Sequence, residues 1–221
     1  MSAKISVIIP VHNTAKYLDR CMESVLGQTF GDIEVILAEN LSTDGSADMC
    51  DDYARRDSRV RVLHLDRAGL SHARNEALLV AESDAVCFID SDDYVDKEML
   101  EQLYSQMVLY GADIVGYNLA QEKDGITQIA PGDDDGSVIS LDKVQLVTAF
   151  LLNVDNWSYT SACTKLFRKS LFDNLKFPEG RFHEDHAVMH LIAEKCTKAV
   201  WLQRAFYHYV YHRESITHTP T

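Results

Sequence analysis

The sequence predicts a single α/β domain built on a doubly wound, mostly parallel sheet flanked by helices. Short apolar runs rich in β-branched residues alternate along the chain with segments whose apolar residues recur at helical spacing, as in sheets whose parallel strands are joined by crossover helices. The chain has 221 residues, of which 46% are hydrophobic, so it has the length and apolar content of one domain with a substantial core. Residues 121–137 are polar and contain glycine, and we interpret them as a loop because apolar periodicity resumes directly afterwards. The expected domain therefore spans residues 1–221.

The first predicted strand covers residues 5–11. This run is apolar and branched with little alternation, as expected of a strand covered on both faces. A helix that Thr14 can cap and Gly27 can end follows it, and a second buried strand covers residues 33–38. The further elements expected in order are a helix over 47–56, a strand over 60–65, a helix over 70–81, a strand over 85–89, a helix over 97–109, a strand over 114–117, a periodic apolar segment over 144–151 and a helix over 186–196.

Charge and cysteine usage exclude several classes of protein. The chain carries 34 acidic and 21 basic residues, for a formal net charge of -13, which disfavours nucleic acid as a partner because such binding needs a dense basic surface. Its five cysteines are far apart and include no Cys-x-x-Cys pair, so we expect reduced thiols and a cytoplasmic location. No segment resembles a signal peptide or is long enough to span a bilayer. Peripheral contact with the inner face of a membrane stays open.

Polar residues that follow predicted strands are the first candidates for a ligand site. Open parallel sheets bind ligands outside the carboxyl ends of their strands. Here the residues in these positions are His12 and Asn13, Glu39 and Asn40, and the segment 90–93. Because the carboxyl ends of parallel strands share one edge of the sheet, we expect these side chains to converge.

Three carboxylates, Asp90, Asp92 and Asp93, follow the apolar run 85–89. Hard divalent cations such as Mg²⁺ and Mn²⁺ take oxygen ligands and commonly share them with substrate phosphates. The alternative is that Asp93 or Asp96 caps the helix that follows. Three acids within four residues exceed what a cap needs, but the spacing alone leaves both interpretations open.

A second acidic pair, Glu184 and Asp185, opens the helical segment 186–196. A carboxylate in this position can act as a general base on an attacking hydroxyl. Acids are also common in the first turn of a helix, where the macrodipole favours them, so helix capping is the alternative. The residues alone leave both interpretations open.

Residues 67–75 combine a flexible glycine, a helix start and two cations, of which one is Arg74. Such a helix start can bind phosphate or nucleotide oxygens, and the alternative is an ordinary solvated first turn. Neither the P-loop nor the dinucleotide-binding glycine fingerprint is present. His208, His212 and His218 are interpreted as strand and tail surface rather than as a zinc site, because no cysteine or carboxylate completes a ligand set.

Seven segments, taken in order, resemble glycosyltransferase family 2, whose members have the GT-A fold and in many cases build bacterial surface polysaccharides. The segments are residues 6–13, 35–46, 69–75, 88–94, 165–168, 177–185 and 213–217. The resemblance runs across nearly the whole chain. It implies a single GT-A domain over residues 1–221, with a nucleotide-sugar-binding half over 1–117 and an acceptor and catalytic-base half over 118–221.

The resemblance also assigns expected roles at the nucleobase. The segment that contains Pro10, His12 and Asn13 would pack on the base, and the turn that contains Glu39 and Asn40 would hydrogen-bond its edge. Many relatives have two aspartates and a glycine in that turn, and a tyrosine in place of His12, so base recognition departs from the family pattern here. Because asparagine still hydrogen-bonds a pyrimidine edge and imidazole still stacks, uridine is the expected nucleoside.

At the sugar and diphosphate, the resemblance implies a further set of roles. Asp90 would face the ribose, Asp92 would bind a divalent cation, Mn²⁺ or Mg²⁺, and Asp93 would lie beside it. Asp185, preceded by Glu184, resembles the catalytic base of the family. Two arginines are expected to contact the nucleotide-sugar, namely Arg74 from the helix-start segment and Arg213 from the late segment that closes over the diphosphate.

The expected function is therefore inverting transfer of a sugar from a UDP-sugar to a hydroxyl of a glycan or lipid-linked acceptor. Asp185 would remove the acceptor proton while the hydroxyl attacks the anomeric carbon, and the metal with Arg213 would stabilise the departing diphosphate. A non-catalytic nucleotide-sugar-binding protein is the alternative, since the turn at Glu39 is altered. A nucleotidyltransferase would be expected to carry a glycine-rich phosphate loop, which the sequence lacks.

Overall fold

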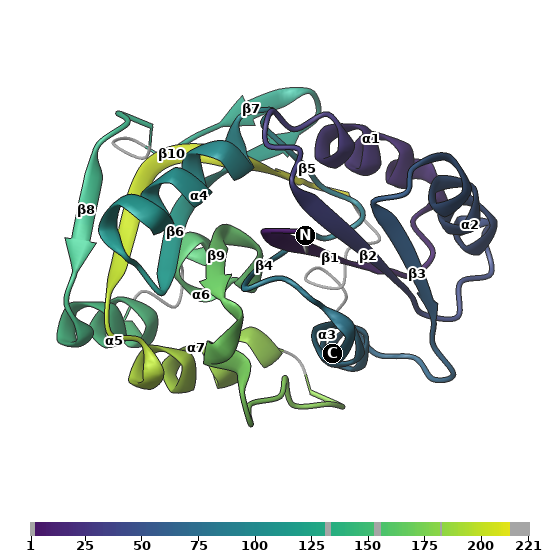
Figure 1. The fold of residues 1–221 in the computed structure, drawn as a ribbon. Helices are drawn as coiled ribbons and strands as arrows, with labels where there is room; N and C mark the ends of the chain where they lie inside the picture. The colour runs from purple at the N-terminus through teal and green to yellow at the C-terminus, as the bar shows by residue number, and fades with distance from the viewer. Residues whose placement is uncertain (1–2, 131–133, 153–155, 182, 213–221) are drawn as a thin grey trace.

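The computed structural model describes residues 3–130, 134–152, 156–181 and 183–212, which form a single α/β domain around a ten-stranded sheet (Figure 1). The strands run in the order β3-β2-β1-β4-β9-β6-β10-β5, with β7 paired to β6 and β8 paired to β10. The strand bounds are β1 (Ile5–Val11), β2 (Ile33–Glu39), β3 (Val60–His64), β4 (Ala85–Phe88), β5 (Tyr94–Val95), β6 (Ile114–Lys123), β7 (Ile126–Gln128), β8 (Val138–Leu141), β9 (Lys165–Arg168) and β10 (Ala199–Val210).

The α-helices are α1 (Ala15–Leu26), α2 (Ser46–Arg56), α3 (Leu70–Val80), α4 (Met99–Tyr110), α5 (Lys143–Leu152), α6 (Trp157–Thr160) and α7 (Glu184–Lys195). Two 3-10 turns, η1 (Ala162–Thr164) and η2 (Lys169–Phe172), flank β9. None of the helices in the described part of the chain has the length and apolar character needed to cross a membrane.

The winding of the chain reverses beside β1. This strand pairs in parallel with β2 on one side and with β4 on the other, in registers that begin at Ile5↔Ile33 and Ile5↔Ala85. Helices α1 and α2 lie on one face of these strands and α3 lies on the other (Figure 1), as right-handed crossovers in opposite directions require. A reversal of this kind opens a crevice at the carboxyl ends of β1 and β4.

Most of the sheet runs in one direction, as predicted. Strands β1, β2, β3, β4, β6 and β10 share that direction, and β5, β7, β8 and β9 oppose it. β9 lies between β4 and β6 and is antiparallel to both. Because β9 follows residue 117 in the chain and β4 precedes it, the two functional halves implied by the family resemblance share one sheet.

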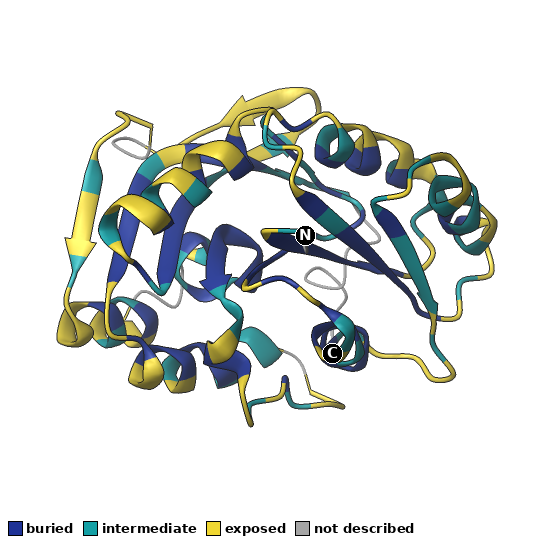
Figure 2. Ribbon diagram, viewed as in Figure 1, coloured by how far each residue is buried: buried dark blue, intermediate teal, exposed yellow. Residues whose placement is uncertain are grey.

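The inner strands carry the core. All seven residues of β1 are buried, and the central strands are dark in Figure 2, whereas the outward surfaces of α1, α2 and α4 are largely exposed. The ring of Phe88 at the end of β4 packs against Phe167, Phe172 and Phe177, with centroids 6.2, 5.7 and 5.5 Å away. These rings give the acidic segment that follows β4 a rigid support.

The largest difference from the predicted elements concerns residues 121–137. The prediction of a loop is wrong for the first part of this stretch, because β6 continues to Lys123 and β7 pairs with it. Asp124 and Gly125 form the connecting turn with φ values of 52° and 77°. An Asp-Gly pair is a strong hairpin signal, since both central residues of the turn need positive φ.

The helix after the acidic segment begins without a cap from its aspartates. α4 starts at Met99 with Glu98 in the N-cap position, and no side-chain cap hydrogen bond is made. The capping alternative for Asp93 and Asp96 is therefore wrong, and their carboxylates have other partners.

Candidate active site

The residues after β1, β2 and β4 converge at one edge of the sheet. The three strands are parallel neighbours, so His12–Asn13, Glu39–Asn40 and Asp90–Asp93 lie at the crevice where the winding reverses. A hydrogen bond of 2.9 Å from Thr14 Oγ1 to Ser91 Oγ ties the β1 turn to the acidic segment. The structure thus brings together the groups that the sequence predicted to meet.

Hydrogen bonds lock the turns after β1 and β2 to one another. The backbone N–H of Thr43 donates to Asn13 Oδ1 (2.8 Å), and the backbone N–H of Asn13 donates to Ser42 Oγ (3.1 Å). His12 Nδ1 lies 2.6 Å from the backbone oxygen of Asn40. Because a carbonyl oxygen only accepts, the proton of the neutral imidazole is on Nδ1. Asn13 adopts a positive φ of 54° at this turn, a conformation that asparagine tolerates better than most residues.

Glu39 holds the β2 turn, whereas Asn40 presents an unused acceptor. Glu39 is 4% exposed and accepts a hydrogen bond of 2.6 Å from the Ser42 N–H. Burial alone would favour the neutral acid, but the hydrogen bonds from Ser42 and His64 lower the pKa of Glu39. Asn40 is also 4% exposed, and its buried Oδ1 has no hydrogen-bond partner in the described part of the chain. A buried acceptor without a partner is costly, so this position suits a ligand that brings a donor. Pro10 lies buried inside β1 beside this turn.

The three aspartates after β4 have different surroundings. Asp93 is 2% exposed and accepts hydrogen bonds from the Tyr207 hydroxyl (2.6 Å) and the Val210 N–H (2.8 Å). Burial, with the nearby charges of Asp92 and Asp90, raises the pKa of Asp93 well above its usual range. The side chains of Asp90 and Asp92 are 36% and 26% exposed. Asp93 therefore fastens β10 to the acidic segment, whereas Asp90 and Asp92 stay partly exposed and contact Arg74 and His212.

A buried guanidinium joins the acidic segment to the predicted base. Arg74 is 2% exposed. Its Nη1 lies 2.7 Å from both Glu184 Oε1 and Asp185 Oδ1, and its Nη2 lies 3.2 Å from Asp90 Oδ1. Burial disfavours the charged form, but Asp185 and Asp90 outweigh it and raise the pKa of Arg74 well above its usual range. The rings of Phe88 and Phe177 lie 5.9 and 5.4 Å from the guanidinium carbon.

The surroundings of Arg74 correct one expectation. The alternative of a solvated first turn for residues 67–75 is wrong, because residues 71–75 are all buried. Ser71 Oγ donates to the backbone oxygen of Pro178 (2.8 Å), and the Asn75 amide bonds both backbone groups of Phe177. The start of α3 is therefore packed against the segment that leads into α7.

Asp185 is held at both carboxylate oxygens. Oδ1 faces Arg74, and Oδ2 accepts a hydrogen bond of 2.9 Å from the backbone N–H of Ala162. The N-cap of α7 is His183, without a side-chain cap bond, and both acids lie in the first turn of the helix, where the macrodipole favours them. Their contacts with Arg74 and Ala162 go beyond what a helix start needs. The side chains of Glu184 and Asp185 are each 14% exposed. Burial, together with the charge of Asp185, raises the pKa of Glu184 against the opposing effect of Arg74.

The donor set of the acidic segment fits a cation that shares its ligands with substrate. No group of three or more His, Cys, Asp and Glu side chains within the described ranges is arranged to hold a metal ion. Mg²⁺ is commonly bound through one or two carboxylates and completed by phosphate oxygens and water. Asp92 supplies such a carboxylate, and its Oδ2 lies 2.6 Å from His212 Nε2. The residues present therefore suit Mg²⁺ or Mn²⁺ bound together with a diphosphate.

Two histidines near the end of β10 require a correction. His208 stacks on Tyr94 with centroids 4.3 Å apart, and its Nε2 lies 2.9 Å from Asp96 Oδ1. His212 stacks on Tyr17 with centroids 4.9 Å apart. Their side chains are only 15% and 16% exposed, so the interpretation of both as surface residues is wrong. His218 and the predicted diphosphate ligand Arg213 lie outside the described residues.

Sequence reasoning gave no role to three residues that support the site, although one of them, Lys165, lies in the family-like segment 165–168. Tyr207 binds Asp93 and also accepts a hydrogen bond of 3.1 Å from the backbone N–H of Asp90. Ala162 acts through its backbone N–H, so its side chain gives no signal. Lys165 is 0% exposed, and its Nζ lies 2.9 Å from Ser158 O and 2.6 Å from Ser161 O. Burial lowers the pKa of Lys165 to about 7. A hydropathy pattern does not predict a buried lysine at the start of a short strand.

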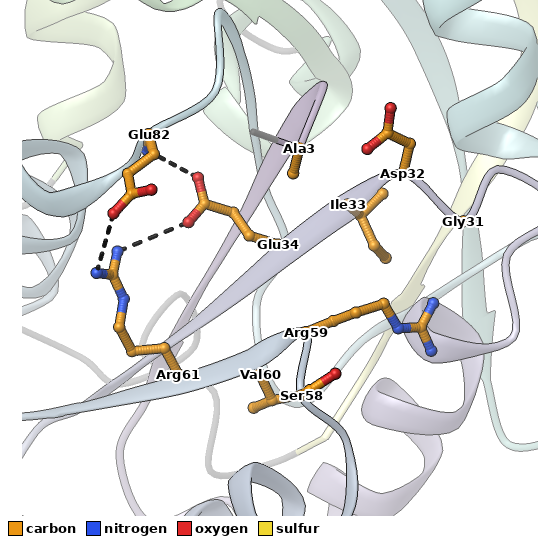
Figure 3. A pocket seen from close by; sticks show the side chains of 10 residues that line it. All are labelled: Ala3, Gly31, Asp32, Ile33, Glu34, Ser58, Arg59, Val60, Arg61 and Glu82. Atoms are coloured by element: carbon orange, nitrogen blue, oxygen red, sulfur yellow. Dashed lines mark hydrogen bonds and ion pairs between the residues drawn. The ribbon is translucent and has the colours of Figure 1, made fainter. Parts of the chain in front are cut away.

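A cavity of about 430 Å³ lies at the opposite edge of the sheet (Figure 3). Its charged residues neutralise one another, since Arg61 lies 3.6 Å from Glu34 and 3.8 Å from Glu82. Arg59 forms an ion pair of 2.7 Å with Asp57. This cavity is at the amino ends of β1, β2 and β3, away from the crevice where the site residues converge.

Comparisons with known proteins agree with this geometry. Residues 6–176 match the model of the glycosyl transferase family 2. Glycosyltransferase GlyG of Streptococcus pneumoniae is 35% identical over 99% of this chain and 74% of its own length. The uncharacterized glycosyltransferase EpsJ of Bacillus subtilis is 33% identical over 98% of this chain and 63% of its own length. Glycosyltransferase GlyA of S. pneumoniae is 31% identical over 97% of this chain, which spans only 31% of that protein.

Among solved structures, residues 1–349 of TarS from S. aureus, in complex with UDP-GlcNAc, superpose with a TM-score of 0.84. The two chains are 22% identical, and the match covers 99% of this chain and 61% of TarS 1–349. At this identity the likeness shows the fold, and it confirms the GT-A fold expected from the sequence. The family model, the relatives and the fold agree that this chain belongs to glycosyl transferase family 2.

Proposed function

We propose that this chain is an inverting glycosyltransferase that moves a sugar from a UDP-sugar to an acceptor hydroxyl with the help of Mn²⁺ or Mg²⁺. One observation carries the proposal: Arg74 binds Asp90, from the segment that would hold the donor, and Asp185, which would activate the acceptor. A general base must lie within hydrogen-bond reach of the reacting hydroxyl. A shared guanidinium keeps the base carboxylate close to the donor carboxylate.

The nucleobase site is supported by the geometry of the β1 and β2 turns. Uracil carries an imide N–H, and the unpaired Oδ1 of Asn40 supplies the acceptor for it. His12 is exposed and contacts the backbone oxygen of Asn40, so it provides a ring for stacking near this residue. Glu39 and Asn13 hold the two turns in place. TarS has been solved with UDP and with UDP-GlcNAc, which supports a uridine nucleotide as the donor for this related fold.

The chemical step is a single displacement at the anomeric carbon. Asp185 takes the acceptor proton, the hydroxyl oxygen bonds to the anomeric carbon, and the bond from that carbon to the diphosphate oxygen breaks, so that UDP leaves. Arg74 orients one oxygen of Asp185, and the Ala162 N–H holds the other. A divalent cation bound at Asp92 would supply positive charge to the departing diphosphate. Asp90 would hydrogen-bond the ribose, and Arg213 would contact the diphosphate.

The pathway and the acceptor are the remaining parts of the proposal. A glycan or lipid-linked acceptor in bacterial surface polysaccharide or glycoconjugate synthesis agrees with the curated relatives, which are themselves glycosyltransferases. Such acceptors place the enzyme in the cytoplasm, at the inner face of the membrane.

A nucleotide-sugar panel tests the proposal. Thermal stabilisation by UDP-sugars in the presence of Mn²⁺, followed by UDP release on addition of acceptor glycosides, is the expected result. Stabilisation without any turnover would instead favour a non-catalytic nucleotide-sugar-binding protein. Stabilisation by a purine nucleotide-sugar but by no UDP-sugar would contradict the assignment of the base.

A further inference from the structure

A second cavity, of about 340 Å³, opens to the surface between the end of β6, the strand β7 and the start of α6. Its polar lining consists of Gln121, Gln128, Asn156, Trp157 and Ser158, and the other lining residues are apolar. None of the described residues that line it is charged, in a chain whose formal net charge is -13.

The cavity lies on the same face and at the same edge of the sheet as the acidic site. In β6 and β10, which are parallel, Leu119 pairs with Tyr207 and Gln121 pairs with Tyr209. Side chains of paired residues in neighbouring strands point to the same face, and Tyr207 reaches Asp93 from that face. β6 also runs in the direction of β4, so its carboxyl end lies at the edge where the acidic segment begins.

One short segment forms a wall of the cavity and also holds the predicted base. Trp157 opens α6, and five residues later the Ala162 N–H donates to Asp185 Oδ2. Lys165 clamps the segment between them through the backbone oxygens of Ser158 and Ser161. A ligand against Trp157 therefore lies beside the structure that fixes the base.

The lining has the chemistry of a neutral saccharide site. Trp157 is half-buried, and its ring packs edge-on against Tyr209 with centroids 5.1 Å apart at 84°, which fixes its orientation. An indole face packs well on the C–H face of a pyranose ring, and amide groups bind its hydroxyls as both donors and acceptors.

Amide groups are available to such a ring. Gln121 and Gln128 are cross-strand partners in β6 and β7, and neither side-chain amide has a hydrogen-bond partner among the described residues. Asn156 uses Oδ1 to accept from the Ser158 N–H (3.0 Å), which leaves its NH₂ donors for a ligand. Such amides around a fixed aromatic ring suit the hydroxyls of a sugar, whereas a phosphate would find no cation among the described lining residues.

We propose that this cavity binds a neutral sugar ring of the acceptor, with Trp157 as its platform and Gln121 and Gln128 as its hydroxyl partners. The identification of this sugar as the acceptor rests on the proposed transferase function, but the saccharide site itself does not. The two can therefore be tested separately.

The first test measures saccharide binding without a donor. Saturation-transfer NMR with methyl β-glucoside, methyl β-galactoside and methyl N-acetyl-β-glucosaminide is expected to show transfer to at least one ring with the wild-type protein. Trp157→Ala and Gln128→Ala should weaken that binding about tenfold, the scale of one or two lost contacts. Gln102→Ala, at an exposed glutamine of α4, should bind like wild type. Melting curves check that every variant is folded.

Tryptophan fluorescence gives a second reading of the same binding. The chain has two tryptophans, and Trp201 is 1% exposed, so a change on addition of the glycoside reports Trp157. Equal binding by wild type and Trp157→Ala would overturn the proposal, as would the absence of binding to every glycoside of the panel.

Calorimetry with UDP separates this proposal from the function itself. Trp157→Ala should leave UDP affinity unchanged and raise the KM for an acceptor glycoside about tenfold. Loss of UDP affinity by the same factor as glycoside affinity would overturn a local subsite. Glycoside binding by a wild-type protein that neither binds UDP-sugars nor turns them over would leave the saccharide site standing and remove the transferase function.

Discussion

Arg74 and Asp185 lie 111 positions apart in the sequence, yet Nη1 of the arginine meets Oδ1 of the aspartate at 2.7 Å in a contact where the arginine is 2% exposed. The same guanidinium reaches Asp90 in the acidic segment that follows β4. One buried cation thus fixes the spacing between a carboxylate that would bind the donor and a carboxylate that would activate the acceptor.

We expect Asp185→Asn to lower sugar transfer by about a hundredfold or more, the usual scale for the loss of a general base. The amide keeps the shape of the side chain but takes no proton at neutral pH, so the loss should appear in turnover and UDP affinity should persist. Glu184→Gln is the matched control, and its loss should be smaller. Near-normal transfer by Asp185→Asn, measured beside a melting curve, would remove the base assignment and make Glu184 the next candidate.

Arg74→Met should destabilise the protein by about 3–5 kcal/mol, because it leaves buried carboxylates without a countercharge. Arg74→Lys keeps the charge but cannot bridge several carboxylates as a planar fork does, so it should fall between Arg74→Met and wild type. Arg67→Met is the control, since its ion pair with Glu179 joins side chains that are 59% and 41% exposed, and such pairs contribute about 0–1 kcal/mol. Equal urea midpoints for Arg74→Met and Arg67→Met would contradict the central role of this cation.

Asn40→Ala should weaken UDP binding about fivefold to thirtyfold without lowering the melting temperature of the free protein. Its Oδ1 has no partner to lose in the described structure, whereas the bound uracil would lose a hydrogen bond. His12→Ala should weaken UDP binding through lost stacking, and Gln102→Ala on α4 should have no effect. Calorimetry with bare UDP decides the matter, because wild-type affinity in both site variants would place the nucleobase elsewhere.

UDP-sugar binding should require a divalent cation. Without one, the carboxylates of Asp90 and Asp92 and the diphosphate would repel each other across the crevice. Calorimetry in Mn²⁺, compared with the same titration in excess chelator, should show a loss of affinity of at least tenfold. Equal affinities in the two buffers would contradict the metal assignment.

Lys165 should make the folded protein more stable as the pH rises above 7. Burial lowers its pKa to about 7 in the folded chain, whereas an unfolded lysine titrates near about 10.4. Between these values the unfolded chain binds more protons, so the penalty for burying Lys165 is full below pH 7 and fades as the pH rises. The stability of wild type relative to Lys165→Met should therefore rise from pH 7 to pH 9, by up to about 1.4 kcal/mol per pH unit.

Urea denaturation at pH 7, 8 and 9 measures this difference. Lys176→Met, at an exposed lysine, is the matched control and should show the pH dependence of wild type. Parallel curves for wild type and Lys165→Met across this range would show that the buried ammonium does not titrate there.

The parallel half of the fold follows from the sequence because its strands are buried on both faces. The runs at 5–11, 33–39 and 85–88 are mostly apolar, with Ser6, Glu34 and Glu39 as the exceptions, and each leads into polar residues of the candidate site. The position of these candidate residues could therefore be predicted from the topology. β9 could not be predicted in this way, because it begins at the buried Lys165, whose hydrogen bonds to backbone oxygens of residues 158 and 161 are not visible in a hydropathy pattern.

Contacts between residues that are distant in the sequence are the part of the site that could not be predicted. From the sequence, the segment around Arg74 could equally be a solvated helix start. The carboxylates that pair with its charge come from the segment after β4 and from α7. Tyr207 is one of several aromatic residues in β10, and only its contact with Asp93 distinguishes it. Spacing along the chain carries no information about either contact.

The hydrogen bonds that Asp93 accepts from Tyr207 and Val210 link segments that are synthesised at different times. Each spans more than a hundred residues, 114 and 117 positions respectively. During synthesis the acidic segment precedes β10, so the Asp93 carboxylate gains these two partners only after β10 has been made. A chain that stops before β10 would keep the candidate donor residues of the first half and lose both hydrogen-bond donors to the buried Asp93 carboxylate. The second half of the protein therefore supplies the contacts that hold the acidic segment of the first half in place.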